Sequence, residues 1–201
     1  MGNCDSRASN SSPALGFLTV VENPQFGLFG GYLILNGAGR PLEFHCTAPI
    51  KPNRAQEILY GPTLEAFLYG EQIGQTLINQ GSITPLLVCT DREPALAARE
   101  FMATPLVLVM PPEDFLDDKT VDTVPITNTS GRVLRLDPPH RGGPRLVTFQ
   151  HGRNRLALPE RAEEDRRLIS EGLAGLDDLF DLAEPFQRIR DAIEEAQQAV
   201  R

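Results

Sequence analysis

The sequence of 201 residues contains no tryptophan and few lysines or cysteines. Its three cysteines, Cys4, Cys46 and Cys89, include no Cys-x-x-Cys pair and leave an odd one, which argues against a disulfide framework and a zinc site. We therefore expect a reducing, cytoplasmic environment. The chain also lacks a run of about 18 apolar residues, so no association with a membrane is expected.

Several motifs that would identify an enzyme class are missing as well. The sequence has no Walker loop, no dinucleotide-binding fingerprint, no serine-hydrolase elbow and no internal repeat. Apolar residues make up 41% of the chain, which is enough for a sizeable core. The composition therefore indicates a globular protein whose function has to be inferred from where its charged residues fall.

The net charge of −8 is unevenly distributed along the chain. Residues 156–201 carry twelve acidic and six basic residues, whereas residues 131–155 carry six arginines and a single acid, Asp137. These arginines are Arg132, Arg135, Arg141, Arg145, Arg153 and Arg155. Guanidinium groups bind phosphate oxygens in a bidentate manner, so this segment is the candidate site for nucleic acid or another anion. The alternative is that its arginines form ion pairs with the acidic helices that follow.

Three strand-like runs follow a polar segment at residues 1–13, which we expect to be a disordered leader. Residues 15–21 are apolar and β-branched, residues 30–36 form a second run, and residues 42–47 alternate as a third. A glycine-containing turn at residues 37–40 joins the last two runs. Antiparallel strands are therefore expected to open the domain.

Helices and strands alternate in the next part of the chain. Asn53 is a candidate N-cap for one helix and Thr63 for the next. The expected helices cover residues 54–60, 63–79 and 94–101, and the expected strands cover residues 86–90 and 106–110. A strand, a helix and a strand in this rhythm imply a parallel crossover.

The remaining chain is predicted to form a linker, a basic hairpin and helices. Residues 112–130 are rich in proline and aspartate and indicate the linker. Residues 131–158 are expected to form a β-hairpin whose strands cover residues 132–136 and 145–150. Residues 159–201 form an amphipathic helical extension, in which Pro185 is expected to start the last helix. The apolar stripe of this extension either packs on the domain or mediates association with another chain.

The order of elements over residues 15–111 resembles the ribonuclease H-like fold. Members of that family carry a carboxylate on the first strand, a glutamate on the first helix and an aspartate at the end of the fourth strand. The matching positions here are Glu22, Glu57 and Asp91, and the glycine-rich stretch at residues 27–32 matches the turn into the second strand. The resemblance implies an α/β domain over residues 14–111 with a mixed sheet.

The resemblance also implies a chemistry for the three acids. In the family such carboxylates hold two divalent metals, usually magnesium, which activate water and stabilise the leaving oxygen in phosphodiester cleavage. Glu22, Glu57 and Asp91 are therefore the candidate catalytic residues and metal ligands. Each also has an ordinary interpretation: Asp91 as the cap of the following helix, Glu57 as a solvated helix residue, and Glu22 as part of a turn.

Two functions follow from these observations. The first is a non-catalytic binding or regulatory module on a ribonuclease H-like core, which engages a protein partner or a second copy through residues 159–201. The alternative is a magnesium-dependent nuclease with Glu22, Glu57 and Asp91 as metal ligands, whose arginines within residues 131–155 hold nucleic-acid phosphates. The two differ in whether the three carboxylates converge, because a two-metal site holds its ions about 3.5–4 Å apart.

Overall fold

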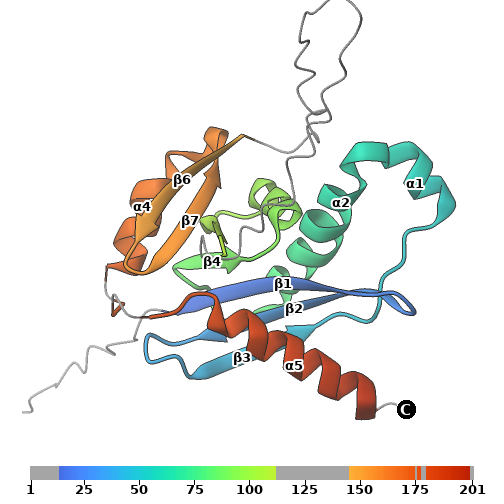
Figure 1. Cartoon of the computed structure of the whole chain (residues 1–201), viewed down its shortest axis with the longest axis horizontal. Coiled ribbons are helices and arrows are strands. Elements are labelled where there is room, and N and C mark those ends of the chain that lie inside the picture. Colours follow the sequence, from blue (N-terminus) through green and yellow to red (C-terminus); the bar gives the residue numbers. More distant parts are fainter. Residues whose placement is uncertain (1–13, 112–144, 175, 178–179, 200–201) are drawn as a thin grey trace, which may run out of the picture.

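The computed structural model describes residues 14–111, 145–174, 176–177 and 180–199. Within these residues seven strands form one mixed sheet in the order β3-β2-β1-β4-β5-β7-β6 (Figure 1). The strands are β1 (Leu15–Asn23), β2 (Gly27–Leu35), β3 (Pro41–Cys46), β4 (Leu87–Thr90), β5 (Leu106–Val109), β6 (Leu146–His151) and β7 (Asn154–Pro159). The leader and the linker predicted from the sequence lie outside the described residues.

The strand directions confirm the predicted fold class. β2 is antiparallel to both β1 and β3, whereas β4 runs parallel to both β1 and β5. The β6–β7 hairpin extends the sheet, since β7 pairs antiparallel with β5. The protein is therefore an α/β fold with a ribonuclease H-like strand order, to which a hairpin and C-terminal helices are added.

Helical segments cover both faces of the sheet (Figure 1). One side carries α1 (Arg54–Tyr60), η1 (Gly61–Thr63), α2 (Leu64–Ala66), η2 (Phe67–Gln75), α3 (Thr76–Gln80) and η3 (Glu93–Phe101). The other side carries α4 (Asp165–Leu173) and α5 (Glu184–Ala199), and η5 (Glu160–Ala162) connects β7 to α4. None of the helices in the described parts of the chain has both the length and the apolar character needed to cross a bilayer.

Alternation along β1 divides the core into two layers. Leu15 and Phe17 pack with the residues of α4 and α5, while Leu18 and Val20 pack with those of η2 and η3. Because helices cover both faces, every residue from 15 to 20 is buried. This is why β1 appears in the sequence as a continuous apolar run rather than an alternating one.

Two adjacent glycines on β2 let helices approach the sheet from opposite sides. A Cβ atom at Gly30 would lie 2.2 Å from the Cγ2 atom of Ile73 in η2. A Cβ atom at Gly31 would lie 2.2 Å from the Cγ2 atom of Ile189 in α5. Side chains at these positions would therefore push the helices away. The glycine-rich stretch at residues 27–32 thus lies entirely within β2, and Gly30 and Gly31 serve packing rather than forming a turn.

The apolar stripe of the C-terminal extension is used inside the domain. Phe186, Ile189 and Ile193 on α5 are each at most 3% exposed and belong to the core beneath β1 and β2. The prediction that residues 159–201 engage a partner or a second copy is therefore not supported, because the face that would do so is covered by the sheet. Pro185 lies in the first turn of α5, close to the predicted helix start.

Two local predictions need correction. The hairpin forms between β6 and β7, joined at Gly152 and Arg153, with Gly152 at a φ of 54°. The strand predicted over residues 132–136 lies outside the described residues. Residues 67–75 form a π-helix rather than a continuous α-helix, and Thr63 makes no capping bond there but donates its hydroxyl to the carbonyl of Tyr60 at 2.8 Å.

Candidate functional site

Asp91 follows β4 and joins three elements of the fold. The Thr19 hydroxyl on β1 donates a hydrogen bond to its Oδ1 atom at 2.6 Å. The Arg190 guanidinium on α5 donates to its Oδ2 atom and completes an ion pair. The Asp91 side chain is 15% exposed and that of Arg190 is 34% exposed, so the carboxylate is largely screened from water while the guanidinium is partly exposed. Both carboxylate oxygens are therefore occupied by groups of the protein itself.

The pairing of β1 with β4 explains the contact between Thr19 and Asp91. The parallel register places Leu18 beside Thr90, so the next residues along the two strands, Thr19 and Asp91, are also neighbours. Thr19 is fully buried, and its hydroxyl requires a partner in that position. The residue of β1 that lies beside Asp91 is thus a threonine, and Glu22 lies three residues further along the strand.

Asp91 does not cap the following helix. Helix capping was the structural alternative to a metal-binding role for this acid. η3 begins at Glu93, and the residue in the cap position is Arg92, which makes no capping bond with its side chain. The N–H group of Arg92 instead donates to Oγ1 of Thr90 at 3.2 Å. Through its contacts with Thr19 and Arg190, Asp91 instead connects β1 and α5 at the end of the parallel strands.

Glu22 lies on the opposite face of the sheet from Asp91. Its Oε1 atom accepts a hydrogen bond at 2.7 Å from the hydroxyl of Tyr69, which belongs to η2. Residues three apart on a strand point to opposite faces, so Glu22 faces η2 while Thr19 faces α5. Burial, followed by the hydrogen bond to Glu22, raises the pKa of Tyr69 above its ordinary value, and this hydroxyl stays protonated and donates.

Glu57 lies on α1, and its ion pair is with a residue of the same helix rather than with a neighbour of Glu22 or Asp91. Its Oε2 atom is 3.0 Å from the Nη1 atom of Arg54 in an exposed ion pair. The helix is held by the predicted cap: the Asn53 side chain accepts from the N–H of Gln56, whose side chain accepts from the N–H of Asn53. No residue of α1 is buried. This location matches the interpretation of Glu57 as a solvated helix residue.

The structure does not bring the three predicted metal ligands together. Glu22 and Asp91 lie on opposite faces of the sheet, and Glu57 lies on an exposed helix. Among the residues that the structure describes, no group of three or more histidine, cysteine, aspartate or glutamate side chains is placed to hold a metal ion. The physical reason is the alternation of side chains along β1, which turns Glu22 away from Asp91.

Three of the six arginines predicted to bind phosphate lie in the part of the chain that the structure describes. Arg145 precedes β6 and Arg153 lies in the turn that follows β6, so the two lie at opposite ends of that strand. Arg153 is 3.8 Å from Asp181, an ion pair of the kind expected if these arginines contact the acidic C-terminal part. Arg155 is partly buried on β7. Arg132, Arg135 and Arg141 lie outside the described residues.

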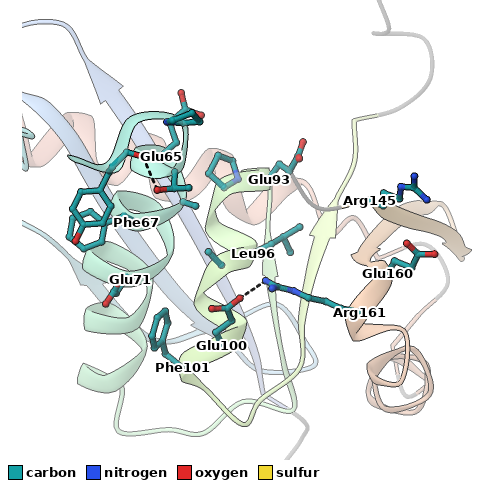
Figure 2. Close-up of a pocket in the computed structure, with 16 residues that line it drawn as sticks. Glu65, Phe67, Glu71, Glu93, Leu96, Glu100, Phe101, Arg145, Glu160 and Arg161 are labelled. Atoms are coloured by element: carbon teal, nitrogen blue, oxygen red, sulfur yellow. Dashed lines mark hydrogen bonds and ion pairs between the residues drawn. The ribbon is translucent and has the colours of Figure 1, made fainter. Parts of the chain in front are cut away.

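A cleft of about 800 Å³ lies on the η2 and η3 side of the molecule (Figure 2). One wall comes from η1, α2 and η2, the floor from η3, and the other wall from η5 and the start of β6. Its charged lining residues are Glu65, Glu71, Glu93, Glu100, Glu160, Arg145 and Arg161. A smaller cleft of about 430 Å³ lies between the end of β1 and α5, next to Arg190.

Sequence reasoning missed Thr19, Tyr69 and Arg190 as partners of the acids. Thr19 left one signal, because it is the polar residue within the apolar run of β1. Arg190 is one of several charged residues on an amphipathic helix, and its partner is 99 residues earlier in the chain. Only the docked position of α5 distinguishes it from its neighbours.

Comparisons with known proteins add one resemblance. No protein-family model matches the chain, and no curated protein matches it. Among solved structures, it is similar to endonuclease V of Ciona intestinalis in complex with a DNA that contains an inosine followed by a ribo-adenosine. The two share 12% sequence identity with a TM-score of 0.41, over 92% of this chain and 86% of the other. The resemblance is a coarse one of fold.

Proposed function

We propose that this protein is a non-catalytic binding module for a protein partner, built on a ribonuclease H-like core. The observation that carries the proposal is the occupation of Asp91 by Thr19 and Arg190. Each carboxylate oxygen keeps a second lone pair, but the positive guanidinium of Arg190 at Oδ2 opposes the approach of a cation while α5 stays docked. The acid that the resemblance places at a metal site thus has a structural use here.

The surface of the module supports a binding role. Ile58 and Leu59 on α1 are 67% and 81% exposed, although they are large apolar side chains. Their helix contributes nothing to the core and stands at the edge of the molecule (Figure 1). Adjacent exposed apolar residues on a surface helix are typical of protein interaction surfaces. The partner surface is therefore proposed at α1 and its surroundings instead of the C-terminal helices.

A photo-crosslinking amino acid placed at Leu59 tests the binding role. We expect it to give a discrete protein adduct in a lysate of the source organism, and we expect Ile58→Glu to abolish that adduct. The matched control is the same crosslinker at Leu168, which is 47% exposed on α4 and distant from α1 in the sequence. Equal adducts from both positions, or an adduct that survives Ile58→Glu, would contradict a specific surface at α1.

A magnesium-dependent nuclease is the second candidate function. The observation in its favour is the position of Asp91 at the end of β4, beside β1, where the family resemblance places an aspartate. For a cation to bind Asp91 together with Glu22 and Glu57, α5 and α1 would have to move and the end of β1 would have to turn the Glu22 side chain toward the face of Asp91. The arginines within residues 131–155 would then contact the phosphates.

Cleavage assays separate the two functions. Labelled single-stranded and duplex oligonucleotides, in DNA and RNA form, are incubated with the full chain and Mg²⁺ or Mn²⁺. The binding module predicts that cleavage by the native protein equals that by Asp91→Asn. Metal-dependent cleavage that Asp91→Asn removes would overturn the proposal and establish the nuclease. Arg190→Ala is a sharper variant, because it frees Asp91 and should increase cleavage only if a metal site exists.

A further inference from the structure

Among the residues that the structure describes, the lining of the cleft on the η2 and η3 side carries an excess of negative charge. Its lining holds five glutamates against two arginines, a formal excess of three negative charges. One pair is satisfied within the cleft, since Arg161 lies 2.6 Å from Glu100 (Figure 2). Glu65, Glu71 and Glu93 are exposed and have no ion pair within the described residues. Such a surface attracts cations and repels phosphates.

Aromatic side chains lie among these glutamates. Tyr60 and Phe67 stack with ring centroids 4.0 Å apart, and this stacked pair forms part of one wall. Phe101, at the end of η3, is 41% exposed (Figure 2). Aromatic faces attract guanidinium and ammonium groups and also accept apolar side chains. The cleft therefore combines features that suit a chain with both positive charges and apolar residues.

The cleft is continuous with the exposed surface of α1. Tyr60 is the last residue of α1 and lines the cleft, and Ile58 and Leu59 precede it directly. The volume of about 800 Å³ falls within the range that holds several side chains of a bound segment. A partner that enters the cleft thus has an apolar surface available next to it.

We propose that this cleft binds a basic segment of a partner protein, with arginine or lysine paired to Glu65, Glu71 and Glu93 and an apolar side chain between Phe67 and Phe101. The inference rests on the proposed function and names the partner's chemistry. Charge complementarity selects a basic segment over an acidic one and over nucleic acid. The stacked rings supply a second attraction for arginine.

The test uses the full chain and a fluorescein-labelled synthetic peptide in which arginine and leucine alternate. Fluorescence anisotropy is expected to show saturable binding that weakens as salt is raised. A matched peptide with glutamine in place of arginine is expected to bind at least about tenfold more weakly. If the arginine peptide does not bind, or if the two peptides bind equally, the inference is overturned.

Variants locate the binding site. The triple variant Glu65→Gln, Glu71→Gln and Glu93→Gln is expected to lose about tenfold in affinity. Its control is Asp191→Asn, Glu194→Gln and Glu195→Gln, which removes the same charge from α5, outside the cleft. Equal losses in the two triple variants would show a general charge effect and overturn the assignment to the cleft.

A final variant addresses the chain's own arginines as an alternative occupant. If Arg132→Gln, Arg135→Gln and Arg141→Gln together increase the affinity for the peptide, these arginines compete for the cleft, and the assignment to a partner is overturned. Unchanged affinity supports the partner. These outcomes are separable from those of the proposed function, because the cleavage assay measures the effect of Asp91 and the crosslink measures contact at Leu59. Neither measurement uses the peptide.

Discussion

The guanidinium of Arg190 on α5 forms an ion pair with the carboxylate of Asp91, 99 residues earlier in the chain. Thr19 on β1 donates to the same carboxylate. Three elements that are distant in sequence are therefore joined by one side chain at the end of the parallel strands. An acid that resembles a metal ligand in the sequence is used to dock a helix.

Removal of either partner of this pair should destabilise the protein. Asp91→Ala and Arg190→Ala are each expected to lower the free energy of unfolding by about 1–3 kcal/mol, because the remaining group stays partly buried without its partner. The double variant should lose less than the sum of the single losses, with a coupling energy above about 0.5 kcal/mol. Urea unfolding followed by circular dichroism measures all three values.

Arg167→Ala is the control for this cycle. Arg167 forms an exposed ion pair with Glu171 on α4, and its side chain is 82% exposed. Such a pair contributes little, so the expected loss is below about 0.5 kcal/mol. A double-mutant cycle at Asp91 and Arg190 with no coupling would show that the ion pair does not hold α5 in place.

The sequence was sufficient to predict the order of strands and helices over residues 15–111, but not strand β7 or the partners of the acids. Asn53 has the side chain and spacing of a helix cap, and it forms one. The position of Glu22 relative to Asp91 depends instead on the register between β1 and β4, which is set by pairing across 72 positions. Once Thr19 is known to lie beside Asp91, the alternation of the strand places Glu22 on the other face.

The π-helix could not be predicted for a different reason. Residues 67–75 have ordinary helical spacing in the sequence, which does not distinguish a π-helix from an α-helix, and in the structure they pack against η3. Gly70 lies so close to η3 that a Cβ atom there would be 2.6 Å from Cβ of Ala97. Tertiary packing of this kind overrides local propensity.

A second ion pair fixes α4 to η3 and should be among the most sensitive in the protein. Arg99 donates from Nε to Asp165 at 2.6 Å and from a terminal nitrogen at 3.1 Å, and also donates to the carbonyl of Met102. The hydrogen bond to Asp165 raises the pKa of Arg99, which stays charged. Asp165→Ala is therefore expected to cost about 3 kcal/mol in the free energy of unfolding.

The neighbouring pair of Arg161 and Glu100 provides a matched control for Asp165→Ala. Its shortest distance is also 2.6 Å, but its side chains are 61% and 53% exposed, whereas that of Asp165 is 9% exposed. Glu100→Ala should therefore cost less than about 1 kcal/mol. Equal losses for the two variants, measured by urea unfolding, would contradict the role assigned to burial.

Glu43 on β3 should contribute to the stability of the protein against acid. Burial raises the pKa of its carboxyl, but hydrogen bonds from Ser82 and His45 outweigh burial and hold the pKa below its ordinary value. A carboxyl with a lowered pKa in the folded state stabilises the fold above its unfolded pKa, and this stabilisation is lost as the pH falls through the folded value. The affected range therefore lies below the ordinary glutamate pKa of 4.5.

Glu43→Gln is expected to lose less stability than the native protein between neutral pH and about pH 3.5. The measurement is the shift of the urea midpoint between the two pH values. Glu195→Gln is the control, since Glu195 is exposed on α5. If Glu43→Gln and Glu195→Gln show the same acid shift, the hydrogen bonds to Glu43 have no role in acid stability.

Gly31→Ala should displace α5 from the sheet. The added Cβ would lie 2.2 Å from Cγ2 of Ile189 and 3.0 Å from Cδ1 of Ile193, so the helix must move or the side chains must repack, at a cost of about 1–3 kcal/mol. Ile189→Ala removes the nearer clash, and the double variant should therefore lose less stability than the two single losses together. Urea unfolding of the three variants gives these values. Strict additivity would show that Gly31 and Ile189 are not in the close contact that brings α5 against β2.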